Sequence, residues 1–264
     1  LIYSIIFNIL YLVIFKYVDF LILNFNYALN SNIELLNLPF PLALSFVTFQ
    51  TIAYLVDCYD DEISNISFKK YALFIIFFPQ LIAGPIVKYN FMSTQFENID
   101  NKKINNFNIM LGLIILAIGF IKKVLIANNL AIVVDNGYAL SETLNFLDSW
   151  LISLSFTFQL YFDFGGYIDM ATGIALLFNI RIPQNFNSPY KASSIIDFWQ
   201  RWHMTLTSFL TSYIYFPILR SLKIVTFFRT MIVTIVVFFI AGIWHGPTWF
   251  YILFGLFHGL GIII

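Results

Sequence analysis

Histidine is the side chain best suited to proton transfer near neutral pH, and three histidines occur in this chain. One of them, His245, lies in Gly242-Ile-Trp-His-Gly-Pro-Thr-Trp249, where Gly246-Pro247 interrupts a helix and leaves nearby carbonyl groups without partners. A histidine near a helix end is commonly an interfacial residue. The break and the two flanking tryptophans instead favour a role for His245 as a general base.

A second polar stretch, residues 197–208, contains His203. Asp197 and Arg201 are four residues apart, so they are predicted to pair along a helix, which lowers the cost of burying both charges. Trp199 and His203 have the same spacing and are predicted to share a face of that helix. An interfacial aromatic belt is the alternative, and it explains the tryptophan and arginine residues better than it explains His203.

Two aspartates lie in the third stretch, residues 158–173. Asp163 and Asp169 are candidate functional residues because an ionisable group inside an apolar segment is expensive to desolvate. On a helix, Gly165, Asp169 and Thr172 share one face, where a neighbouring helix could approach closely and shield Asp169 from lipid. The alternative is that both aspartates only cap or bond neighbouring helices, and both interpretations remain open.

The third histidine, His258, lies beyond the Gly246-Pro247 break, and we interpret it as a packed helix residue. His203, His245 and His258 lack the close-spaced pair that is typical of metal ligands, so no metal site is predicted. Cys58 is the only cysteine, which excludes a disulfide scaffold. The sequence contains no Gly-rich phosphate loop and no nucleophile elbow.

Long apolar segments must position these residues. A bilayer-spanning helix needs about 20 mostly apolar residues, and several windows approach that length. Pro and Gly residues interrupt Tyr71–Val87, which makes it a candidate re-entrant segment. The predicted windows are Leu1–Leu23, Phe40–Val56, Tyr71–Val87, Ile109–Val134, Trp150–Ile180, Ile195–Leu219, Val225–Ile243 and Trp249–Ile264.

The composition excludes a soluble fold. Charged residues are 11% of the 264 residues, hydrophobic residues are 60%, and the mean hydropathy is +0.83, whereas soluble proteins contain about 25% charged residues. The 14 basic and 14 acidic residues cancel, so there is no basic field for nucleic acid. We predict an all-α, polytopic transmembrane bundle with broken or re-entrant helices. We also expect residues 1–264 to be one membrane-embedded unit and an incomplete fragment, because both ends lie inside apolar runs.

Seven blocks, in order along the chain, resemble the membrane-bound O-acyltransferase family. The similarity is to the bacterial branch that includes alginate O-acetyltransferase and the D-alanyl transfer protein of teichoic acid. The matching blocks are Ser45–Asp57, Phe77–Ile86, Gly119–Leu130, Gln159–Ala171, Asn185–Tyr190, Phe198–Leu206 and Trp244–Gly246.

The resemblance implies a membrane enzyme with many helices around a tunnel, which links a cytoplasmic acyl donor to an acceptor on the other side. The family's invariant histidine falls on His245, the expected general base, and a second recurrent histidine falls on His203, which would orient or stabilise the reacting groups. Further residues are expected to line the tunnel or the substrate. These are Asp163, Asp169, Trp199, Arg201 and Trp244.

The same resemblance implies an acyl thioester donor such as acetyl-CoA, used as a co-substrate, with no bound cofactor. The expected acceptor is a hydroxyl of a cell-envelope or exported polysaccharide, reached through a periplasmic or extracellular transferase partner. The expected location is the inner membrane of a bacterial cell, crossed several times. The lipid bilayer is then an expected partner of the protein, and nucleic acid is not.

The sequence also has features of two other classes of protein. Broken helices, intramembrane aspartates and the Asp197–Arg201 pair are also typical of an ion-coupled transporter. Against a transporter, the chain shows no inverted repeat of its apolar segments, and transport does not require the aromatic–histidine blocks. The other class is a catalytically inactive assembly subunit, and the presence of both His203 and His245 argues against it.

Overall fold

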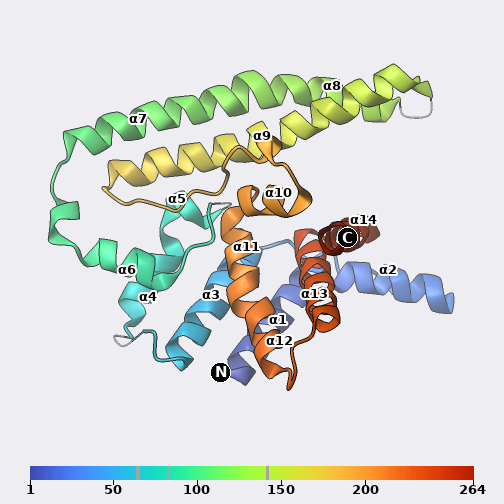
Figure 1. Cartoon of the computed structure of the whole chain (residues 1–264), viewed down its shortest axis with the longest axis horizontal. Coiled ribbons are helices and arrows are strands. Elements are labelled where there is room, and N and C mark those ends of the chain that lie inside the picture. Colours follow the sequence, from blue (N-terminus) through green and yellow to red (C-terminus); the bar gives the residue numbers. More distant parts are fainter. Residues whose placement is uncertain (64–65, 83, 141–142) are drawn as a thin grey trace. The chain divides into compact units, whose positions relative to one another are not determined.

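The computed structural model describes residues 1–63, 66–82, 84–140 and 143–264. In these ranges every regular element is a helix (Figure 1), which confirms the predicted all-α class. Residue 83, inside the predicted Tyr71–Val87 segment and the Phe77–Ile86 block, lies outside the described residues. The chain forms two compact units, which we call the first unit (Leu1–Ile75 with Phe186–Ile264) and the second unit (Ile76–Asn185).

The second unit is built on two long helices that run side by side (Figure 1). Helix α7 (Asn106–Phe120) continues through a π-helical turn (Ile121–Ala127) into α8 (Asn128–Ala139), so that Asn106–Ala139 is one helix of 34 residues. Helix α9, Phe146–Leu177, packs along all three parts. The elements before them are α5 (Phe78–Leu81), α6 (Tyr89–Glu97) and a 3₁₀ turn (Ile99–Lys102).

Pairs of glycines let α7 and α9 approach closely. A Cβ on Gly173 would lie 2.6 Å from the carbonyl oxygen of Gly112, and one on Gly166 would lie 2.9 Å from that of Gly119. By contrast, a Cβ on Gly165 would meet no atom within 4 Å. The expectation that a neighbouring helix approaches closely at Gly165 was therefore wrong, although Asp169 on the same predicted face does pair with Lys122 of the neighbouring helix. The residue after Gly165, Gly166, makes the close contact, because successive helix positions are rotated by about 100°.

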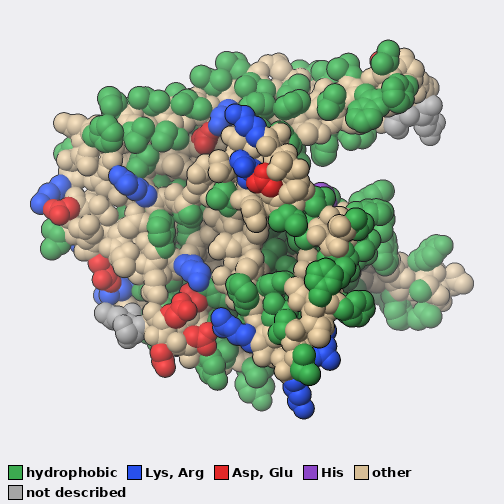
Figure 2. Space-filling model, viewed as in Figure 1, with side chains coloured by type: hydrophobic (Ala, Val, Ile, Leu, Met, Phe, Trp, Pro, Cys, Tyr) green, Lys and Arg blue, Asp and Glu red, His purple; other side chains and the backbone are tan. Residues whose placement is uncertain are grey.

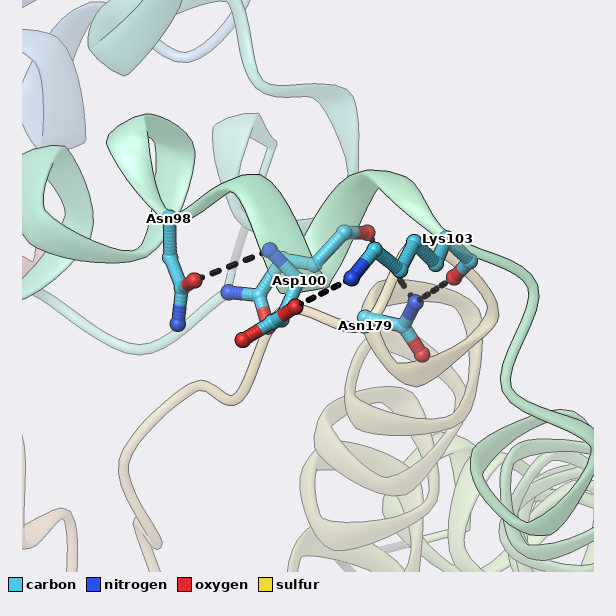
Figure 3. Close-up of polar contacts among 5 residues, drawn as sticks. Asn98, Asp100, Lys103 and Asn179 are labelled. Carbon is cyan, nitrogen blue, oxygen red and sulfur yellow. Dashed lines mark hydrogen bonds and ion pairs between the residues drawn. The ribbon is translucent and has the colours of Figure 1, made fainter.

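Polar contacts hold the end of α9 to the 3₁₀ turn (Figure 3). Asn179 Nδ2 donates to the carbonyl oxygens of Asn101, at 3.0 Å, and Lys103, at 2.6 Å. The Lys103 ammonium pairs with Asp100 Oδ1 at 2.7 Å, and the Asn98 side chain accepts from the backbone N–H of Asp100. These bonds satisfy backbone groups that the helix ends leave open.

Shorter and more broken helices make up the first unit. Helices α1 and α2 meet at Tyr17 with a bend of 66°. Helix α13 packs against α14, and the Thr226 side chain caps the N-terminus of α13. The helices are α1 (Ile2–Lys16), α2 (Val18–Leu29), α3 (Leu44–Tyr59), α4 (Phe68–Ile76), α10 (Ile195–Arg201), α11 (Met204–Leu210), α12 (Phe216–Ser221), α13 (Phe227–His245) and α14 (Trp249–Ile263).

Among the described residues, two helices are long and apolar enough to cross a membrane, Asn106–Ala139 and Phe227–His245. A third span results if the bent α1–α2 pair counts as one. The predicted window Ile195–Leu219 was wrong as a single helix, because α10 ends at Arg201 and α11 begins at Met204. Figure 2 shows hydrophobic side chains covering α7 and α8, as expected for a surface in contact with lipid.

Candidate functional site

The predicted break after His245 is confirmed. Helix α13 ends at this residue, Gly246 has an extended backbone, and α14 begins at Trp249. The His245 ring is half-buried and lies between aromatic neighbours, with ring centroids 5.1 Å away for Trp244 and 6.0 Å away for Tyr251. The imidazole nitrogen atoms of His245 have no hydrogen-bond partner among the described residues.

His203 lies in a second break of the chain, between α10 and α11. Its backbone is left-handed, with φ of 46°, which is uncommon outside glycine and marks candidate functional positions. The ring is 2% exposed, and its centroid is 6.3 Å from that of Trp244. Burial lowers the pKa of His203, so the neutral imidazole is favoured.

The structure thus brings His203, His245 and Trp244 together in the first unit. The Trp244 indole contacts both imidazole rings. It also stacks on Phe49 of α3, with centroids 5.0 Å apart. Two histidines predicted from separate motifs therefore share one aromatic neighbour.

The prediction that Trp199 and His203 share a face of one helix was wrong, because α10 ends at Arg201 before His203 is reached. The Trp199 indole Nε1 instead donates to Nδ1 of His258 at 3.3 Å. His258 is thus a hydrogen-bond acceptor as well as a packed residue. Sequence spacing gave no signal for this pair, since the two residues lie on helices far apart in the chain.

Trp199 also lines a cavity of about 170 Å³ in the first unit. Its wall is mostly apolar, and the residues that line it include Leu206, Phe238, Ala241 and Thr207.

Arg201 pairs with Asp197, as predicted, at 2.6 Å between Nε and Oδ1. This bond and the backbone N–H of Ser193 hold the pKa of the Asp197 carboxyl below its usual value. The pair spans one turn of α10, so it stabilises the short helix that leads to the His203 break.

Asp163 and Asp169 belong to the second unit, and each has a lysine partner on the neighbouring helix. Lys122 Nζ lies 2.5 Å from Asp169 Oδ2, and Lys123 pairs with Asp163. Both lysines come from the π-helical turn Ile121–Ala127. These ion pairs agree with the alternative that Asp163 and Asp169 only bond to neighbouring helices. A role of Asp163 or Asp169 in a tunnel stays a prediction.

Sequence reasoning missed Lys16 and Tyr17, at the bend between α1 and α2. Lys16 Nζ donates to the carbonyl oxygen of Trp244 and, at 3.2 Å, to Ser45 Oγ. The Tyr17 hydroxyl donates to the carbonyl oxygen of Ile243 at 2.7 Å. Both side chains thereby satisfy carbonyl groups that α13 leaves open at its C-terminus.

Apolar helices long enough to cross a bilayer, together with two histidines at chain breaks, define a helical membrane protein with a candidate site for proton transfer. Residues 55–264 match the description "MBOAT, membrane-bound O-acyltransferase family". The chain belongs to this family.

Named relatives agree with the family match. The chain is 46% identical to a peptidoglycan O-acetyltransferase of Helicobacter pylori over 290 aligned positions, which cover all of this chain and 54% of the relative. It is 37% identical to a probable alginate O-acetylase AlgI of Pseudomonas syringae pv. tomato, covering 95% of this chain and 48% of the relative. A teichoic acid D-alanyltransferase of Streptococcus thermophilus is 27% identical, and the alignment covers 90% of this chain and 59% of the relative. The chain spans about half the length of these curated relatives.

Proposed function

We propose that this chain is the catalytic core of a membrane-bound O-acyltransferase and that His245 is its general base. The observation that carries the proposal is the half-buried His245 imidazole, which has no hydrogen bond to a described residue and lies at the end of a membrane-length helix. The buried His203 ring lies near the same Trp244 ring, with centroids 6.3 Å apart. Family membership and the similarity to two kinds of O-acetyltransferase support the reaction class.

In the proposed reaction an acceptor hydroxyl attacks the carbonyl carbon of an acyl thioester. His245 takes the hydroxyl proton as the C–O bond forms, and the carbonyl π electrons move onto oxygen to give an oxyanion. When these electrons re-form the C=O bond, the C–S bond breaks, and the thiolate takes the proton from His245. His203 is proposed to orient the acceptor or the thioester within the site.

The donor is proposed to be an acyl thioester from the cytoplasm, with acetyl-CoA as the first choice, because the relatives named above include O-acetyltransferases. We propose as the acceptor a hydroxyl of a cell-envelope or exported polysaccharide, with a periplasmic or extracellular transferase as partner. The same proposal places the chain in the bacterial inner membrane, crossing it several times. The tunnel residues proposed from the family are Asp163, Asp169, Trp199, Arg201 and Trp244.

Transfer of labelled acetyl groups from acetyl-CoA in membrane vesicles tests this function. His245→Ala is expected to lower the transfer rate by about 10²–10⁴-fold, which is the usual contribution of a general base. Trp249→Phe, at an exposed residue beyond the break, is the matched control and is expected to retain activity. Equal amounts of inserted protein must be compared. Full activity in His245→Ala refutes the assignment, and gradient-driven uptake without acetyl transfer favours a transporter.

A further inference from the structure

Lys16 is a half-buried cation without an acidic partner. Its ammonium makes two hydrogen bonds, to the carbonyl oxygen of Trp244 and to Ser45 Oγ, both of which are neutral acceptors. Among the described residues no carboxylate pairs with it. One of its three N–H groups therefore remains free for another acceptor.

Such an arrangement is expensive for a membrane protein. A charge removed from water and left without a counter-ion is unfavourable, and ionisable residues in apolar segments are therefore usually functional. The faces of Tyr17 and Trp244, with centroids 5.6 and 5.7 Å from Nζ, offset only part of this cost. The charge would be matched in full by an anion that is present during the reaction.

The position of Lys16 indicates which anion that is. Its ammonium donates a hydrogen bond to the backbone carbonyl oxygen of Trp244, the residue directly before His245. The Trp244 indole Nε1 is a second donor on the same residue, and it is buried with no hydrogen-bond partner among the described residues. A cation and a neutral donor with unused N–H groups thus lie beside the residue proposed to accept a proton.

We propose that Lys16 stabilises the oxyanion that forms on the thioester carbonyl while His245 holds the proton of the attacking hydroxyl; this rests on the proposed function. Lys16 keeps its own proton throughout. Its positive charge balances the negative charge on the carbonyl oxygen until the C=O bond re-forms and the thiolate leaves. The bend between α1 and α2 brings the ammonium to the end of α13 and thereby completes the site.

A purely structural role is the competing explanation, because Lys16 also caps α13. Tyr17 provides a matched comparison, since it caps the adjacent carbonyl, that of Ile243, through a hydroxyl that carries no charge. If capping were the whole role, then Tyr17→Phe and Lys16→Met would have similar effects, because each removes one cap from the same helix end.

Acetyl transfer by the full chain in membrane vesicles, at varied donor concentration, separates the two roles. Lys16→Met is expected to lower kcat by about 10²–10³-fold, as for the loss of one oxyanion donor, with little change in KM for acetyl-CoA. Lys16→Arg keeps the charge and is expected to recover at least a tenth of the activity. Tyr17→Phe and Lys223→Met, which removes an exposed charge elsewhere, are expected to retain kcat within about threefold.

The outcomes also distinguish this inference from the proposed function. If His245→Ala abolishes transfer while Lys16→Met retains its kcat, the role of Lys16 is refuted and the proposed function stands. If Lys16→Met and Tyr17→Phe lose activity and thermal stability in parallel, Lys16 is only a cap. If the wild-type chain transfers no acetyl group, or His245→Ala transfers it normally, the proposed function itself fails.

Discussion

Replacing Gly173 of α9 by alanine tests the close packing of the two long helices. A Cβ at this position would lie 2.6 Å from the carbonyl oxygen of Gly112 and 2.7 Å from the backbone nitrogen of Leu116. Both are backbone atoms of α7, so no side chain can rotate away to make room. Gly165, on the same helix, is the matched control because a Cβ there meets no atom within 4 Å.

The expected magnitudes follow from two opposing effects. Alanine in place of glycine stabilises a helix interior by about 1 kcal/mol. At Gly173 the helices must also separate by about 0.8 Å to bring the 2.6 Å contact to an ordinary 3.4 Å, and overpacking of this kind costs about 2–3 kcal/mol. Gly173→Ala should therefore lose about 1–2 kcal/mol, whereas Gly165→Ala should gain about 1 kcal/mol.

Unfolding of the purified chain in mild detergent, titrated with a denaturing detergent and followed by circular dichroism, measures both variants. The free energies of unfolding of the two variants are expected to differ by about 2–3 kcal/mol, with wild type between them. Similar effects at Gly165 and Gly173, or a larger loss at Gly165, would refute the assigned helix contact.

Two further predictions concern polar pairs. Trp199→Phe and His258→Leu each remove the bond between the two side chains, and each should cost about 1 kcal/mol of stability. Thermal unfolding of the single and double variants should then reveal coupling, and strictly additive losses would argue against the bond. Asp169→Leu leaves the Lys122 ammonium unpaired and should cost about 1–3 kcal/mol. Adding Lys122→Met should restore most of that loss, and a double variant as unstable as Asp169→Leu would contradict the ion pair.

Features that depend on residue type and close spacing could be predicted from the sequence. The helical membrane class follows from composition, since apolar side chains need no particular contact to favour a bilayer. The break after His245 is local in the same way, because Gly246-Pro247 acts on the helix directly. The pairing of Asp197 with Arg201 needed only helical spacing.

Features that depend on distant contacts were missed. No proline or glycine lies between residues 190 and 203, so no local residue type signals the left-handed backbone of His203. Lys16 meets Trp244 across 228 residues of sequence, which no local pattern encodes. The same limit explains the error at Gly165, because apolar composition predicts a helix here but not the rotation of that helix about its own axis.

The helices are interrupted at Tyr17, at His203 and after His245, and all three interruptions lie near Trp244. Each interruption frees backbone groups, which a membrane tolerates only where protein or trapped water satisfies them. Lys16 and Tyr17 satisfy two of these groups, and in doing so they bring a charge to the end of α13. The breaks and the candidate chemistry therefore have one physical cause. Continuous helices would satisfy their own backbones and would leave Lys16 no carbonyl of α13 to bind.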